Sequence, residues 1–239
     1  MLNEQLLKLR YFDKVSDEEE KALIAACSGS RRIAAREIFV HAKVPQTTSN
    51  LLVRGIVARH MTLEDGSRQI VAIHVPGDFV DLHSFLLNAV EHDIEALTPV
   101  TIALFPHERL SLITETHPHL TRLLWMGTLI DASIHREWVL NVGRRRARPR
   151  IAHLLCELQV RLSIVGQATS AGFALPLTQA DIGDACGLTP VHVNRVLRSL
   201  REAGIATIKA GEVRIHDLAR LKQDAEFDPY YLHVHAEAD

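Results

Sequence analysis

Short hydrophobic runs separated by turn residues fill the first half of the chain. Each run is rich in β-branched or aromatic side chains, a composition typical of strands. The runs are Ile38–Val40, Leu51–Val53, Ile56–Ala58, Ile70–Ile73 and Val100–Leu104. Gly55 and Pro76-Gly77-Asp78 mark turns, and Glu64–Ser67 between two runs is typical of a β-hairpin. The pattern predicts a sandwich or barrel-like roll of short strands.

A helix is predicted ahead of the strands. Ser16 and Glu19 have the spacing of a capping box, in which the serine hydroxyl accepts the Glu19 amide and the glutamate reaches back to the serine amide. The helix should continue to about Cys27.

One long amphipathic helix is predicted from Pro118 to about Val142. Its apolar residues recur at spacings of three and four, with Gly127 among them. They are Leu120, Leu123, Leu124, Ile130, Ile134 and Trp138. This stripe can pack on the chain's own roll or pair with the same helix of a second copy. Its length and nearly heptad spacing favour the dimer, and Gly127 would let another helix approach closely.

The segment Gly143–Arg150 is the best candidate for a domain boundary. Gly143 can end one helix, and Pro149 can lie in the first turn of the next, which should run from Ile151 to about Ile164. The five arginines of this segment can contact DNA phosphates or keep a hinge solvated, and the sequence leaves both roles open.

Residues 178–200 have the pattern of a helix-turn-helix, in which a short turn joins two helices. Gly183 stands where the second helix should cross the first, and Gly187 can adopt the positive φ that the turn needs. The apolar residues expected between the helices are Ile182, Cys186, Leu188, Val193, Val196 and Leu197. After the motif, Gly204–Ile215 has the pattern of two strands around Gly211, which predicts the wing of a winged helix.

Both helices of the motif have start signals, and the second presents a polar face. Thr178 and Asp181 can cap the first helix, while Thr189 and Pro190 can begin the second. Polar side chains on the outward face can donate to base edges or phosphates, and a valine there can meet a thymine methyl. The residues expected to contact DNA are Thr178, Gln179, Thr189, Val191, His192, Asn194, Arg195 and Arg198. An ordinary helical hairpin with a polar outer face explains the combined pattern less well.

Charge is unevenly divided, although the net charge is only −2. Residues 144–222 hold 13 Lys or Arg and 6 Asp or Glu, whereas residues 1–143 hold 14 and 18. A basic part behind an acidic one indicates a polyanionic partner for the C-terminal part, which agrees with double-stranded DNA.

From about residue 15 to 222, the chain resembles the CRP/FNR superfamily of bacterial transcription regulators. Asp65–Val71 and Pro76–Phe79 look like the signature of the family's roll. Pro176–Gly183 and Gly187–Leu197 look like its DNA-reading end.

The resemblance implies an α+β architecture in three parts. They are a cyclic-nucleotide-binding-like β-roll at 1–117, a dimerisation helix at 118–143, and a winged helix-turn-helix DNA-binding domain at 144–239. Arg195 matches the family arginine that typically reads a guanine. Val191 stands where many members carry a glutamate, so an operator identical to theirs is not expected.

The resemblance also indicates what the roll does not bind. Members that bind cyclic AMP hold its ribose and phosphate at positions matched here by Leu82, Val90 and Glu91. No Lys or Arg occurs between Arg68 and Arg109, so a buried phosphate would lack a charged partner. Cyclic AMP dependence is therefore not expected. No other cofactor is predicted, and the effector is not identified.

The three cysteines are Cys27, Cys156 and Cys186, which are far apart and odd in number. They fit no disulfide framework, and this agrees with a cytoplasmic location. Oxygen-sensing family members use an N-terminal cysteine cluster for an iron–sulfur centre, which Cys27 alone cannot provide. Cys186 could report redox state beside DNA, but its position in the motif favours core packing.

The 14 histidines raise the question of a metal site. His117 and His119 form one close pair and His233 and His235 another, but neither pair has a helix-spaced partner or an acidic triad. No metal site is predicted, although a haem ligand in the roll stays open. No metalloprotease, hydrolase or P-loop motif occurs, so an enzyme is not expected.

The sequence therefore predicts a homodimeric transcription regulator that binds an inverted-repeat operator and, if it is an activator, RNA polymerase. No window of 18 uncharged apolar residues and no signal-peptide pattern occurs, so no membrane association is expected. The alternative is a regulatory module whose basic end binds something other than DNA, which the helix-turn-helix disfavours.

Overall fold

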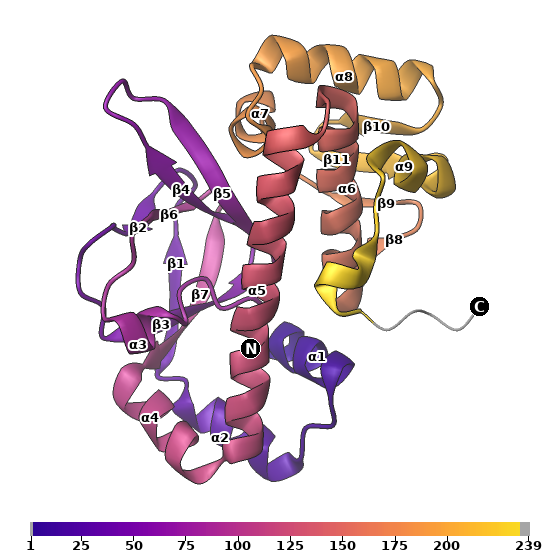
Figure 1. Cartoon of the computed structure of the whole chain (residues 1–239). Helices are drawn as coiled ribbons and strands as arrows, with labels where there is room; N and C mark the ends of the chain where they lie inside the picture. Colours follow the sequence, from indigo (N-terminus) through magenta and orange to yellow (C-terminus); the bar gives the residue numbers. More distant parts are fainter. Residues whose placement is uncertain (1, 235–239) are drawn as a thin grey trace. The chain divides into compact units, whose positions relative to one another are not determined.

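The computed structural model describes residues 2–234 and divides into two compact units. The N-terminal unit comprises Met1–Gly66 and Ala72–Leu129, and the C-terminal unit comprises Ser67–Val71 and Ile130–Asp239. The division falls inside the long helix α5, Pro118–Arg144 (Figure 1). Each unit is therefore described separately.

The N-terminal unit contains the predicted roll of short antiparallel strands. One sheet has the order β1-β7-β3 and the other has the order β2-β6-β4-β5. The strands are β1 Gly29–Ile33, β2 Ile38–Val40, β3 Thr48–Arg54, β4 Val57–Thr62, β5 Arg68–His74, β6 Asp93–Ala96 and β7 Val100–Pro106. Of β5, only residues 72–74 belong to this unit. All five predicted runs lie on strands, except that Ile56 stands just before β4. β1 and β6 were not predicted. The sequence of β1, GSRRI, is mostly polar and does not alternate, and β6, DIEA, has only four residues.

Four helices accompany the strands of this unit: α1 Asn3–Phe12, α2 Asp17–Ala26, α3 Ser84–Leu87 and α4 His107–Thr116. The capping box of α2 is present, since Ser16 accepts from the Glu19 amide and Glu19 accepts from the Ser16 amide. Helix α1 was not predicted. This helix packs closely on the turn at Gly77, which precedes Phe79, a residue that forms an isolated β-bridge with Leu51. A Cβ at Gly77 would lie only 2.9 Å from the Glu4 carbonyl oxygen.

The apolar stripe of α5 is buried within a single chain. Leu120, Leu123 and Leu124 join the core that also contains Leu23, Phe105 and other residues of the N-terminal unit. Ile130, Ile134 and Trp138 are each no more than 6% exposed. The stripe is therefore used by the chain's own packing, which was the alternative that spacing disfavoured. A Cβ at Gly127 would meet no atom within 4 Å, so no other helix among residues 2–234 approaches it closely.

The C-terminal unit is a winged helix. Its helices are α6 Ala147–Ile164, α7 Gln179–Cys186, α8 Pro190–Glu202, α9 Leu218–Ala225 and the 3₁₀ turn η1 Pro229–Leu232. Its strands are β8 Ala168–Thr169, β9 Gly172–Ala174, β10 Ala206–Lys209 and β11 Glu212–Ile215, in the order β10-β11-β9-β8. The predicted wing is confirmed as the β10–β11 hairpin around Ala210 and Gly211, which both have positive φ. Helix α6 begins four residues earlier than predicted, with Pro149 in its first turn.

A buried glutamate ties three parts of the C-terminal unit together. Glu157 of α6 accepts hydrogen bonds from Trp138 Nε1 at 3.0 Å, Arg161 Nη1 at 3.0 Å and the Tyr231 hydroxyl at 2.8 Å. Because a buried carboxylate needs hydrogen-bond donors, this arrangement fixes the end of α5 and η1 against α6. Within residues 2–234, no helix combines the length and apolar character that a membrane span requires.

Candidate nucleic-acid interface

The turn between α7 and α8 has the geometry that its glycines predict. Gly187 adopts φ 60° and ψ 43° and ends α7. The Leu188 amide donates to the Gly183 carbonyl at 2.9 Å, and a Cβ on Gly183 would lie 2.5 Å from the Leu188 carbonyl oxygen. Both glycines are thus required, one by backbone conformation and the other by close approach.

Both helices begin at the predicted caps. The Thr178 hydroxyl accepts from the Asp181 amide, and the Asp181 carboxylate accepts from the Thr178 amide, which completes a capping box. The Thr189 hydroxyl accepts from the His192 amide, with Pro190 in the first turn of α8. The capping role occupies the Thr178 side chain, which also donates to Asp181 at 2.7 Å.

The inward faces of α7 and α8 form the core of the motif. Ile182, Cys186, Val193 and Val196 are buried, as the sequence predicts. Leu188 and Leu197 are only half-buried, which corrects their assignment as buried groups. Both lie at the margin of the motif, where the turn and the flank of α8 meet solvent.

The outward face of α8 brings the predicted DNA contacts together. Val191 is 69% exposed, and the other exposed residues there are His192, Asn194, Arg195 and Arg198. Gln179 of α7 joins them, because Asn194 Nδ2 donates to Gln179 Oε1 at 3.4 Å. Arg198 donates to Glu202 at 2.7 Å one turn along the helix, and this hydrogen bond raises the pKa of Arg198. Arg195 therefore stands near the middle of an exposed polar surface.

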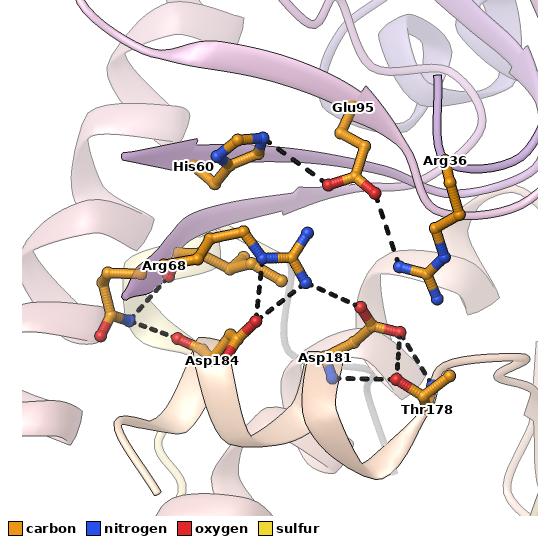
Figure 2. A network of polar contacts seen from close by, with 9 residues as sticks. Arg36, His60, Arg68, Glu95, Thr178, Asp181 and Asp184 are labelled. Atoms are coloured by element: carbon orange, nitrogen blue, oxygen red, sulfur yellow. Dashed lines mark hydrogen bonds and ion pairs between the residues drawn. The ribbon is translucent and has the colours of Figure 1, made fainter. Parts of the chain in front are cut away.

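An arginine outside the motif braces α7 (Figure 2). Arg68 belongs to the segment Ser67–Val71 of the C-terminal unit. Its guanidinium contacts Asp181 at 3.1 Å and Asp184 at 2.8 Å, and Asp181 is only 1% exposed. Gln69 adds a hydrogen bond of 2.6 Å to the Asp184 carbonyl. The carboxylate that caps α7 thus also holds a cation, a role that the local motif does not reveal.

The arginine-rich segment is partly used inside the C-terminal unit. Arg145 contacts Glu137 at 2.7 Å, Arg148 donates to Asp224 at 3.0 Å, and Arg150 donates to the Cys186 carbonyl at 2.7 Å. Arg144 and Arg146 are exposed. Three of the five arginines therefore make structural contacts, and two remain on the surface.

Comparison with known proteins identifies both parts of the chain. A family model described as a cyclic nucleotide-binding domain matches residues 30–117, and one described as a Crp-like helix-turn-helix domain matches residues 149–224. The transcriptional activator protein FnrL of Cereibacter sphaeroides is 30% identical over 216 residues, which cover 89% of this chain and 86% of that protein. The chain belongs to the CRP/FNR family.

Other relatives agree with this assignment. The nitrogen fixation regulation protein FixK of Bradyrhizobium diazoefficiens is 28% identical over 77% of this chain and 76% of its own length. The solved structure of FixK2 from Bradyrhizobium japonicum is similar with a TM-score of 0.75 and 28% identity, over 82% of this chain and 96% of that one. This CRP/FNR protein is therefore a DNA-binding transcription regulator of a non-enzymatic family, with the predicted α+β fold.

The interior of the regulator's roll contains a buried carboxylate, Asp81, whose partners belong to the roll itself. Asp81 is fully buried, and both the Asn50 amide and Asn50 Nδ2 donate to it at 2.6 Å. Burial raises the pKa of Asp81 to about 6, against the opposing effect of Asn50 and Arg59. Arg59 donates to the Val80 carbonyl at 2.8 Å. The prediction about cyclic AMP considered only the stretch between Arg68 and Arg109. Arg59 lies before this stretch and was therefore not considered.

A second buried contact crosses the roll's four-stranded sheet. His60 Nε2 and Arg36 Nη1 each lie 3.6 Å from a carboxylate oxygen of Glu95 (Figure 2). Glu95 is 5% exposed and His60 is 3% exposed. Like Asp81 and Arg59, these charged groups therefore contact other residues of the roll.

Cys186 and the histidines noted in the sequence have surroundings that fit packing and hydrogen bonding within the protein. Burial raises the pKa of Cys186 to about 12, which keeps it a thiol and disfavours a redox role. His119 lies 2.6 Å from Glu19 and 3.4 Å from Asp13, and these contacts raise the pKa of His119. His117 contacts the Thr116 hydroxyl. His235 lies outside the described residues.

Proposed function

We propose that the regulator binds double-stranded DNA by placing the N-terminal half of α8 in the major groove. The observation that carries this proposal is the exposed face of α8, on which Arg195 lies between Val191 and Arg198. A guanidinium can donate two parallel hydrogen bonds to O6 and N7 of one guanine. Arg195 is therefore assigned to base reading, and Gln179 at the start of α7 is assigned to a phosphate contact.

The remaining predicted residues have supporting roles in this proposal. Thr178 and Thr189 hold the helix starts, where free amides favour phosphate. His192, Asn194 and Arg198 flank Arg195 and can contact base edges or phosphates. Val191 can meet a thymine methyl.

The proposed assembly is a homodimer on an inverted-repeat operator with half-sites about one helical turn apart. The support comes from a face of α5 that a single chain leaves uncovered. Trp125, Leu129 and Val139 are 62%, 54% and 75% exposed. With Ala132 and Arg136 between them, these positions repeat at spacings of four and three, as in a coiled-coil seam. The proposed seam consists of these five residues.

The proposed mode of action is activation without cyclic AMP. FnrL is named as a transcriptional activator, so contact with RNA polymerase is part of the proposal. The phosphate stretch of the roll offers buried Val90 and the exposed carboxylate of Glu91, neither of which attracts a phosphate. A protein that reads DNA in a bacterium works in the cytoplasm, and this location completes the proposal.

The test is a panel of operators with single base changes, after genome-wide footprinting has supplied the operator. Arg195→Ala should weaken binding and flatten the preference at one base pair per half-site, by about 1–3 kcal/mol of discrimination. Gln179→Ala is the matched control and should weaken every operator by about the same factor. If Arg195→Ala also gives a uniform loss across the panel, Arg195 contacts phosphate and the base-reading role is wrong.

A further inference from the structure

We propose that His83, Glu91 and His92 form a binding site for a divalent transition-metal ion such as Zn²⁺ or Fe²⁺. Two imidazoles and one carboxylate each offer one ligand atom, and the three atoms all lie within 4.8 Å of one another. All three residues belong to the N-terminal unit, far along the chain from the helix-turn-helix. None of the three residues is among those proposed to contact DNA.

The spacing of the three atoms suits tetrahedral coordination. Metal–nitrogen and metal–oxygen bonds of about 2.0–2.2 Å place neighbouring ligand atoms about 3.3 Å apart. One edge already has this length, since Glu91 Oε1 lies 3.3 Å from His92 Nδ1. The rings of His83 and His92 have centroids 5.5 Å apart and are tilted by 49°, so their nitrogens can converge on one ion after a small rotation of His83.

Backbone hydrogen bonds hold the segments that carry the three ligands. Ser84 is fully buried next to His83, and its amide donates to the Asp81 carbonyl at 2.8 Å. On the other side, Val90 is buried in the roll's core and its carbonyl accepts from the Lys43 amide at 2.7 Å. The Asp93 carboxylate adds a side-chain hydrogen bond, accepting from the Ala42 amide at 2.8 Å. Because the flanking residues are fixed, the ligand geometry costs little ordering entropy when an ion binds.

A turn after α3 brings Glu91 and His92 back to His83. Asn88 ends α3 with φ 66°, and its amide donates to the Ser84 carbonyl at 2.8 Å. The chain therefore reverses between the first ligand and the other two. An eight-residue spacing on a loop matches no helical or strand period, which explains why spacing alone did not indicate this site.

The donor set selects the class of ion. Imidazole nitrogen suits Zn²⁺, Fe²⁺, Ni²⁺ and Cu²⁺, whereas Mg²⁺ and Ca²⁺ prefer oxygen ligands throughout. Three protein ligands leave at least one coordination position for water or a small molecule from solution. Glu91 is on the surface and His92 is 4% exposed, so the ion would be reachable from solvent on one side and shielded on the other.

The test is Zn²⁺ binding to the untagged, full-length protein by calorimetry, with Co²⁺ as a spectroscopic probe and Mg²⁺ as a negative arm. The wild type should bind one tight Zn²⁺ per chain and give a visible Co²⁺ spectrum without a thiolate charge-transfer band. His83→Ala and Glu91→Gln should each weaken Zn²⁺ binding by at least about 10- to 100-fold, the range seen even for outer-shell partners.

His117→Ala is the matched control, because it removes another histidine of the same unit and should leave Zn²⁺ affinity unchanged. Thermal unfolding in chelator shows whether each variant is folded. Should His83→Ala fail to fold, the exposed Glu91→Gln decides the question. Wild-type affinity in a folded Glu91→Gln variant, or no tight Zn²⁺ in the wild type, would overturn the proposal and leave an ordinary Glu91–His92 ion pair.

Discussion

The α-carbon of Gly183 faces the carbonyl oxygen of Leu188, and a Cβ at this position would lie 2.5 Å from that oxygen. The same turn contains the hydrogen bond from the Leu188 amide to the Gly183 carbonyl. Because the carbonyl oxygen that blocks this position belongs to the backbone of the turn, no side-chain rotation can make room for a methyl group. The angle at which α8 leaves the turn thus depends on one missing side chain.

Gly183→Ala should therefore lower the free energy of unfolding by about 1–3 kcal/mol, the usual cost of overpacking. It should also weaken DNA binding, since α8 must shift. Gly127→Ala is the matched control, because it is also a helical glycine but has open space around it. The control should be neutral or stabilising by up to about 1 kcal/mol. Chemical denaturation measures the unfolding free energy of both variants. If Gly183→Ala is as stable as Gly127→Ala, the close approach of the Leu188 carbonyl to Gly183 is contradicted.

Arg68→Ala should destabilise the start of α7. The substitution removes the cation from buried Asp181, and we expect a loss of about 1–3 kcal/mol of unfolding free energy. Arg68→Lys should not restore it fully, because a single ammonium cannot span both carboxylates. Arg31→Ala removes an exposed ion pair with Glu37 and should cost at most about 1 kcal/mol. A loss for Arg68→Ala no larger than for Arg31→Ala would show that the contact is unimportant.

Dimerisation should respond to the exposed face of α5 and not to its buried stripe. Leu129→Glu combined with Val139→Glu should give monomers in sedimentation experiments, while unfolding of the single chain changes little. Inverted-repeat operators should then lose affinity far more than isolated half-sites. Ile24→Glu, at an exposed apolar residue of α2, is the control and should remain dimeric. A dimer that survives the double substitution would exclude the proposed seam.

Stability should fall in mild acid because of His153. This residue is 1% exposed, and burial, with the nearby charge of Arg145, lowers its pKa to about 3. In the unfolded chain, His153 takes up a proton near pH 6.5, whereas in the folded protein it stays neutral down to about pH 3. The stabilisation that neutral His153 contributes is therefore complete above pH 6.5 and is lost as the pH falls from about 6.5 towards 3. The expected slope is about 1.4 kcal/mol per pH unit.

His153→Phe is the variant that isolates this effect, since it keeps an aromatic ring against Phe227 and Tyr231, whose centroids lie 5.2 and 5.8 Å away. The wild type should steadily lose unfolding free energy relative to the variant as the pH falls below 6.5. A constant difference from pH 7 to 5 would mean that folding does not lower the pKa of His153.

Local signals in the sequence predicted most of the fold, including the helix-turn-helix. Capping residues, required glycines and apolar spacing act over a few residues, so Ser16, Thr178 and Gly187 could be assigned without a structure. Strand β1 was missed because its exposed arginines hide the period of two. The identity of the α5 partner could not be predicted either. Periodicity shows which face of a helix is apolar, but not what covers it.

Contacts between distant positions were beyond the reach of spacing. The pairing of Arg68 with Asp181 joins residues 113 positions apart, and no local pattern connects them. The approach of His83 to His92 depends on the positive φ of Asn88, which one residue type does not dictate. In both cases the chemistry is visible in the sequence, and only the folded chain supplies the neighbour.

The internal contacts of Arg145, Arg148 and Arg150 change how the protein should respond to ionic strength. Each phosphate neutralised on DNA releases about 0.9 counterion, so the steepness of the dependence on salt reports how many cations are available. Three arginines held by Glu137, Asp224 and a carbonyl group cannot contribute to that release. Operator binding should accordingly weaken less steeply with rising salt concentration than the basic composition of this segment suggests.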